Sequence, residues 1–276
     1  MLAAWVHGMP ADAVALDDRG LHYGDGLFET IAATGGRACF LGAHLARLAR
    51  GCSLLSMPAP DPQVLQAEVA RAAGLAPHVI VKLIVTRGAA RQRGYGYSGN
   101  EVPRRIVCAY AWPEGPAVVR APARIALAAA AVGRPLCPGV KHLNRLEQVL
   151  ARAEAQRRGL DEVILHMDEG LLSGGSMTNL FALVDGRLVT PPVEHCRVAG
   201  VMRAQLLAAA PRLGLPTCER PMRTCELAAA QALWLTNVRL GLWPVAACDG
   251  RESGVNAWTS RLQRALRAAA GETPGA

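Results

Sequence analysis

A short proline-rich segment, residues 113–122, divides the sequence into two parts that each mix strand and helix patterns. Its three prolines lack backbone N–H donors, which makes the segment unsuited to a helix or a central strand. In the first part, a nearly continuous apolar run predicts a strand at His78–Thr86, and helical apolar spacing predicts a helix at Pro62–Ala73. We therefore predict an N-terminal α+β domain over residues 1–115, a linker at 113–122 and a C-terminal domain over residues 122–276.

Composition narrows the classes of protein to which the chain can belong. Its 276 residues, 51% of them hydrophobic, are enough for two cores and too apolar for a disordered protein. No apolar run reaches the roughly 18–20 residues that span a bilayer, and the first ten residues lack the basic and apolar regions of a signal peptide. A soluble cytoplasmic protein that does not associate with a membrane is expected.

Lysine is rare in this chain, and its rarity limits where amine chemistry can occur. The 30 basic residues include only two lysines, Lys82 and Lys141, and the other 28 are arginines spread along the chain. Because aromatic residues are 4% of the sequence and the arginines are not clustered, we do not expect nucleic-acid binding. Arginine suits carboxylates and phosphates, so a small anionic ligand is compatible with this composition.

Lys141 follows a Pro-Gly turn and precedes a helical pattern whose apolar face includes Leu146 and Leu150. A partly buried lysine loses its proton more easily and can act as a nucleophile or form a Schiff base. Lys82 alternates with apolar residues in a strand, and we expect its stem to lie along a sheet edge with the amine in water. For Lys141 too, a solvated surface charge is the structural alternative.

Several other segments combine glycine with small polar residues, and each is compatible with a structural turn as well as with ligand binding. His44 and Arg47 share a helix face and could hold a phosphate, or could simply be exposed. Gly200 opens a helix whose first N–H groups could bind an anion. The eight cysteines form no CxxC pair and no HExxH motif occurs, so no metal site is expected. The remaining polar segments are residues 18–30, 173–181 and 236–239.

Taken in order, these segments resemble the class IV, or fold-type IV, pyridoxal-phosphate enzymes, from about Trp5 to Val245. That family comprises branched-chain aminotransferases, D-amino acid aminotransferases and 4-amino-4-deoxychorismate lyases. The string DRGLHYGDGLFET is typical of the whole family, whereas GVKHLNRLEQVLARAEA is more similar to the lyases. The resemblance implies a homodimer with a small α+β N-terminal domain and a larger pseudo-barrel C-terminal domain that anchors the cofactor, which would lie in the cleft between them.

The resemblance also implies roles for individual residues. Lys141 would carry the cofactor, pyridoxal 5′-phosphate, as a Schiff base and would act as the catalytic base. Arg47 and the backbone N–H groups of Val201 and Met202 would bind the cofactor phosphate. The implied cofactor-binding residues are Arg47, Lys141, Ser176, Val201, Met202, Thr236 and Asn237. The implied substrate-binding residues are Phe28, Arg93 and Tyr95.

For the function, the resemblance implies a lyase of folate biosynthesis that converts 4-amino-4-deoxychorismate to 4-aminobenzoate and pyruvate. The substrate amine would form an aldimine with the cofactor, Lys141 would abstract a proton, and elimination of enolpyruvate would make the ring aromatic. Two alternatives stay open. One is an amino-acid aminotransferase of the branched-chain or D-amino acid type, and the other is a pyridoxal-phosphate-binding protein without activity.

One position departs from the family pattern. Where the family usually has a glutamate that hydrogen-bonds the pyridine nitrogen of the cofactor, this chain has Gly174. Without that carboxylate a pyridinium is less favoured, and the cofactor is a weaker electron sink. Another acid could substitute, or the protein could be inactive. Our hypothesis is that Gly174 biases the enzyme away from transamination, because aromatisation supplies a driving force that only the lyase reaction has.

Overall fold

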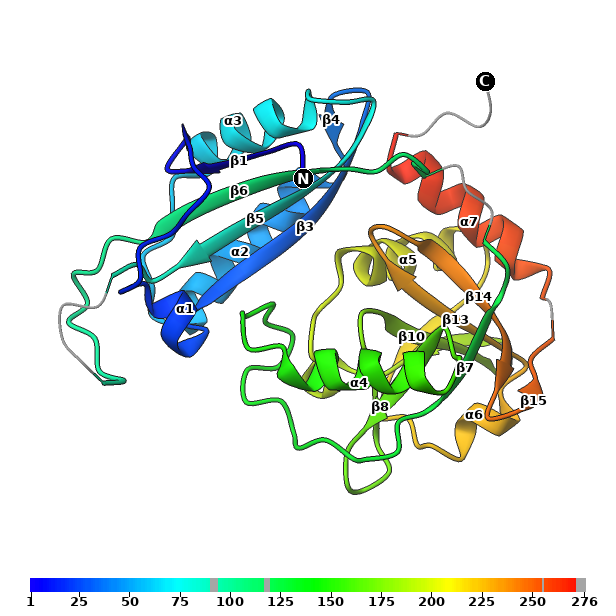
Figure 1. Ribbon diagram of the computed structural model, residues 1–276. Coiled ribbons are helices and arrows are strands. Elements are labelled where there is room, and N and C mark those ends of the chain that lie inside the picture. The colour runs from blue at the N-terminus through cyan, green and yellow to red at the C-terminus, as the bar shows by residue number, and fades with distance from the viewer. Residues whose placement is uncertain (90–93, 117–119, 255, 272–276) are drawn as a thin grey trace. The chain divides into compact units, whose positions relative to one another are not determined.

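The computed structural model describes residues 1–89, 94–116, 120–254 and 256–271 (Figure 1). The chain forms two compact units. One short segment of the second half of the chain belongs to the first unit and interrupts the second. Val140–Asn144, which the sequence analysis placed in the C-terminal domain, groups with the first unit because its backbone pairs with a strand there. The first unit consists of Met1–Val118 and Val140–Asn144, and the second of Val119–Gly139 and Arg145–Ala276.

The first unit is a six-stranded antiparallel sheet with helices α2 and α3 packed on it (Figure 1). In sheet order, the strands are β2 (Met9–Pro10), β1 (Ala3–Val6), β6 (Arg104–Ala111), β5 (His78–Thr86), β3 (Gly26–Thr34) and β4 (Arg37–Ala38). The helices are α1 (Arg19–Tyr23), α2 (Leu41–Leu54) and α3 (Pro62–Ala73). The predicted strand at β5 and the predicted helix at α3 are both confirmed, with Asp61 capping α3 through a 2.8 Å hydrogen bond from the Gln63 N–H.

Alternation along β3 decides which side chains enter the core. Leu27, Glu29 and Ile31 are buried and face the two helices, as do the equally buried alternate residues of β5. The opposite face carries Phe28, together with Lys82 from the neighbouring strand, and both are half-buried. The expectation that Lys82 lies at a sheet edge is wrong, because β5 is paired with β3 on one side and β6 on the other.

The second unit contains a nine-stranded mixed sheet that curves around its core (Figure 1). Along the sheet lie β12 (Thr217–Glu219), β11 (Arg187–Thr190), β10 (Asn179–Val184), β13 (Ala232–Asn237), β14 (Gly241–Cys248), β7 (Ala123–Leu127), β8 (Glu162–His166) and β9 (Leu172–Gly175), and β15 (Arg251–Glu252) pairs with β14. The helices are α4 (Leu146–Arg157), α5 (Val201–Arg212), α6 (Glu226–Ala229) and α7 (Trp258–Ala269), with a 3-10 turn at Val193–His195. Its core is formed mainly by aliphatic side chains, together with Met222, Trp243 and Cys248. No helix in the described ranges is both long and apolar enough to cross a membrane.

Helix α4 exposes its large apolar residues and buries its small ones. Small residues, Ala151 and Ala155, face the core, whereas Leu146, Val149 and Leu150 are 70%, 59% and 60% exposed. Helical periodicity identifies an apolar face but not what covers it. The apolar residues of α4 therefore form an exposed surface, which we call the α4 face.

Candidate functional site

Lys141 lies in the first unit, beside the start of β3. The Phe28 N–H donates to the Lys141 carbonyl and the Leu143 N–H donates to the Gly26 carbonyl, both at 2.9 Å. These two hydrogen bonds pair residues 141–143 with β3 in antiparallel orientation and fix the backbone on both sides of the lysine. The Lys141 Nζ lies 4.1 Å from the centroid of the Phe28 ring, and the Lys82 Nζ lies 5.5 Å from the same centroid.

Glu29, His44 and Arg47 form a buried ion-pair cluster on the helix side of β3. The Arg47 Nε donates to Glu29 Oε1 at 2.8 Å, and its Nη2 donates to Oε2. The His44 Nδ1 is 2.6 Å from Glu29 Oε2. All three residues are buried, so the alternative of an exposed helix face for His44 and Arg47 is wrong. The bidentate pair fixes the orientation of the guanidinium.

The cluster has an electrostatic consequence. Burial raises the pKa of Glu29, but hydrogen bonds and charges from Arg47 and His44 outweigh it and hold this pKa below the usual 4.5. Burial lowers the pKa of His44 below 6.5, although the Glu29 carboxylate opposes this. A neutral His44 therefore donates its Nδ1 proton to Glu29, and its buried Nε2 has no hydrogen-bond partner in the described part of the chain. A buried nitrogen of this kind, close to an arginine, is a place where a ligand can bond.

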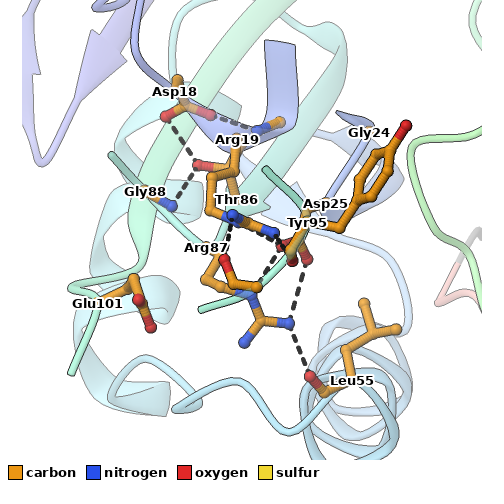
Figure 2. Close-up of polar contacts among 12 residues, drawn as sticks. Asp18, Arg19, Gly24, Asp25, Leu55, Thr86, Arg87, Gly88, Tyr95 and Glu101 are labelled. Atoms are coloured by element: carbon orange, nitrogen blue, oxygen red, sulfur yellow. Dashed lines mark hydrogen bonds and ion pairs between the residues drawn. The ribbon is translucent and has the colours of Figure 1, made fainter. Parts of the chain in front are cut away.

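The glycine-rich segment at residues 18–25 supports the loop that carries Tyr95 (Figure 2). Arg19 and Arg87 each donate from Nε to Asp25 Oδ2 at 2.8 Å. Arg19 also donates to the Tyr95 carbonyl at 2.7 Å and to the Gly96 carbonyl at 2.9 Å. The Tyr95 side chain is 84% exposed, while Arg93 lies outside the described residues. The charged groups of this segment therefore hold the backbone of the loop that carries Tyr95.

In the second unit, the start of α5 has the features of an anion-binding terminus. Gly200 caps the helix without a side-chain hydrogen bond, and the N–H groups of Val201 and Met202 have no carbonyl partner within the helix. A Cβ at Gly200 would lie 2.0 Å from Asn179 Oδ1, so only glycine fits there. Asn179, which the sequence analysis did not select, also donates to the Val198 carbonyl at 3.0 Å and so positions the approach to the helix.

Thr236 and Asn237 end β13 and stabilise the turn into β14. The Thr236 hydroxyl donates to the Gly241 carbonyl at 2.7 Å. The Asn237 Oδ1 accepts from the Leu240 N–H at 2.8 Å, and its Nδ2 donates to the Met177 carbonyl at 3.2 Å. The second of these Asn237 contacts joins this turn to the turn that contains Ser176.

A carboxylate that the sequence analysis missed organises the Ser176 turn. Glu162 is fully buried and accepts hydrogen bonds from Ser176 Oγ at 2.5 Å, Thr178 Oγ1 at 3.1 Å and the Met177 N–H at 3.2 Å. Its oxygen lies beside Gly175, where a Cβ would be 2.7 Å away. The only sequence signal was an acidic residue opening an apolar strand, a position that usually indicates a solvated strand end.

Gly174 is held in a conformation that suits glycine. Its φ is +144°, and an added Cβ would lie 2.9 Å from the Thr178 carbonyl oxygen. A glutamate at this position would require the β9 backbone to change, so the absence of the family carboxylate is built into the local structure.

Replacing Gly174 with alanine is expected to lower the free energy of unfolding by about 1–3 kcal/mol, because backbone strain and the carbonyl contact add. The matched control is Gly186→Ala, because Gly186 has a φ of +71° but open space around an added Cβ. This variant should lose less free energy of unfolding than Gly174→Ala. Urea denaturation followed by circular dichroism measures both. Equal losses in the two variants would show that the Thr178 contact contributes nothing.

The model for amino-transferase class IV matches residues 26–248. The chain belongs to the class IV aminotransferase family. Membership confirms the predicted two-domain fold class and identifies the chain as an enzyme of this family.

Individual relatives include both lyases and aminotransferases. The crystal structure of 4-amino-4-deoxychorismate lyase from Pseudomonas aeruginosa is 40% identical, with a TM-score of 0.88, and the match covers 96% of this chain and 98% of that chain. Aminodeoxychorismate lyase of Vibrio harveyi is 30% identical over 95% of this chain and 97% of its own length. D-alanine aminotransferase of Bacillus licheniformis is 28% identical over 92% of this chain and 91% of its own length.

Proposed function

We propose that this enzyme is a lyase that converts 4-amino-4-deoxychorismate to 4-aminobenzoate and pyruvate, in the cytoplasm and as a step of folate biosynthesis. The observation that carries the proposal is the 40% identity to the Pseudomonas aeruginosa lyase across 96% of the chain. In this chain, Lys141 lies beside the Phe28 ring on a backbone that is fixed by hydrogen bonds, which is compatible with this chemistry. A small anionic substrate also suits a chain with a net charge of +8.

Pyridoxal 5′-phosphate is the cofactor, as predicted. In the first unit, Lys141 would supply the amine that bonds the cofactor, and Arg47, oriented by Glu29, would supply charge for its phosphate. In the second unit, the N–H groups of Val201 and Met202 would bind phosphate oxygens at the start of α5. When bound, the cofactor withdraws electrons from the carbon that bears the substrate amine.

The remaining site residues have narrower proposed roles. Ser176, Thr236 and Asn237 would shape the cofactor-binding surface of the second unit through the turns that they stabilise. Phe28 would pack against the substrate, and the loop of Arg93 and Tyr95 would receive a substrate carboxylate.

Lys141 would move the proton in this reaction. Its amine would remove the proton from the ring carbon that bears the amine, acting as a general base. The ether bond between the ring and the enolpyruvyl group then breaks, the ring becomes aromatic, and the enolpyruvate takes up a proton to give pyruvate. The backbone bonds on both sides of Lys141 limit the positions that its amine can reach.

A direct assay tests the proposal against the aminotransferase alternative, which the Bacillus licheniformis relative favours. Purified protein is mixed with freshly prepared 4-amino-4-deoxychorismate, and release of 4-aminobenzoate is followed. In parallel, branched-chain and D-amino acids are supplied as donors with 2-oxoglutarate or pyruvate as acceptor. Release of 4-aminobenzoate supports the lyase. Amine transfer without release of 4-aminobenzoate would identify an aminotransferase instead. If neither product forms, the protein binds the cofactor without activity.

We also propose that the enzyme is a homodimer and that the α4 face lies in its interface. Three large aliphatic side chains on this helix are more than half exposed, and burying them against a second copy would be favourable. Leu150→Glu is therefore expected to weaken the dimer about tenfold or more, measured by analytical ultracentrifugation. Leu75→Glu, on the first unit and 45% exposed, is the control that should leave association unchanged. A Leu150→Glu variant that associates like the wild type would exclude the α4 face from the interface.

A further inference from the structure

The two lysines of the chain meet at one aromatic ring. Lys141 Nζ lies 4.1 Å and Lys82 Nζ 5.5 Å from the centroid of the Phe28 ring. Since these distances add to 9.6 Å, the two amines are at most 9.6 Å apart. In a chain with 28 arginines, both of its lysines lie at this place.

The fold itself brings Lys82 to this position. β3 and β5 are paired so that Phe28 lies opposite Ile84 and Thr30 lies opposite Lys82, which puts all four side chains on one face of the sheet. Lys141 reaches the same face because its backbone pairs with Phe28. Lys82 is half-buried in a central strand, so part of its surroundings is protein rather than water.

We propose that Lys82 is a positioning residue that makes the Lys141 amine less basic, so that more of it is uncharged and reactive near neutral pH. Two ammonium groups within 9.6 Å repel each other, and removing the proton from Lys141 relieves this repulsion. The Phe28 ring acts in the opposite direction, because its face attracts a cation and favours the protonated amine. The inference rests on the proposed function of Lys141 as the amine that bonds the cofactor.

Other charged groups of the first unit act on Lys141 as well. From β3 comes the Glu29 carboxylate, and from α2 come Arg47 and His44. The Lys141 charge is one of the influences that lower the pKa of His44. His142 is its neighbour in the chain. Glu29 and Arg47 largely compensate each other through their bidentate pair. Lys82 differs from them because it lies on the same sheet face as Lys141.

The rarity of lysine makes the proposal directly measurable. Full-length protein freed of cofactor is methylated with ¹³C-formaldehyde and a mild reductant, which labels Lys82, Lys141 and the N-terminal amine. The ¹³C signals are then followed by NMR as pH is raised at low salt. Lys82→Met leaves one labelled lysine, so the Lys141 signal is assigned directly.

In Lys82→Met the pKa of Lys141 should rise by roughly half a unit to one unit relative to wild type. Lys82→Arg keeps a positive charge and should show the wild-type value, while Phe28→Leu should lower it. Lys82→Gln repeats the test with a polar side chain if the Met variant does not fold, as judged by circular dichroism. An unchanged or lower Lys141 pKa in a folded variant without the charge would overturn the proposal.

The measurement needs neither substrate nor cofactor. An enzyme that proves to be an aminotransferase would still show the effect of Lys82 on Lys141. A lyase without this effect would retain the proposed function and lose only the proposal about Lys82.

Discussion

Lys141→Ala is expected to abolish release of 4-aminobenzoate while leaving the protein folded. Alanine keeps both backbone hydrogen bonds that join this segment to β3, so the first unit loses only the side chain that lies against Phe28. It removes the amine that bonds the cofactor and the base that moves the proton, and the rate should fall by about 10³-fold or more. The assay is product release, with circular dichroism to check the fold.

The chain offers a clean control for this prediction because it has one other lysine. After reduction with borohydride, mass spectrometry of peptides should place the cofactor on Lys141 in the wild type and in Lys82→Arg. It should find no cofactor attached to Lys141→Ala. Attachment to Lys82 in any of these proteins would contradict the assignment of the reactive amine.

Local patterns predicted the strands and helices of the first unit well because each is set by nearby residues. The strand that ends at Thr86 and the helix that begins after its N-cap residue, Asp61, are both found at the predicted positions. The same reasoning located the helix that begins at Val201. In these places burial, capping and turn formation all favour the same structure.

What the sequence did not reveal depends on contacts between distant segments. Glu29 lies on the buried side of β3. Its position between the apolar residues Leu27 and Ile31 indicated burial in the sequence, but its partners come from α2 and could not be predicted from it. Glu162 was missed because its donors follow it by 14 to 16 residues. The apolar face of α4 was visible in the sequence, but periodicity cannot distinguish a face that packs in a core from a surface that binds another chain.

The roles of individual residues could be predicted only through family resemblance. Nothing in the pattern around Lys82 distinguished it from a lysine at a sheet edge, and only the pairing of β5 with two neighbours placed it beside Phe28. Arg47 was selected for its spacing from His44, while the carboxylate that orients it lies 18 residues away.

Glu29→Gln should lower the free energy of unfolding at pH 7 by about 3–5 kcal/mol, since it leaves the buried Arg47 guanidinium without its counter-charge. The amide matches the carboxylate in size, so the loss reports charge and hydrogen bonding rather than a cavity. Urea denaturation followed by circular dichroism measures it. Glu68→Gln is the matched control in the same unit, and its partner Arg105 is more exposed, so it should lose less.

The dependence of this loss on pH separates charge from packing. The pKa of Glu29 is lower in the folded protein than its usual 4.5, so its contribution to stability is present above about pH 4.5 and is lost as pH falls through the folded value. Glutamine does not titrate, and the difference in stability between wild type and Glu29→Gln should therefore shrink on acidification below pH 4.5. If the difference stays constant through that range, the pair contributes through shape alone. If Arg47 binds the cofactor phosphate, Glu29→Gln should also weaken cofactor binding, whereas Glu68→Gln should not.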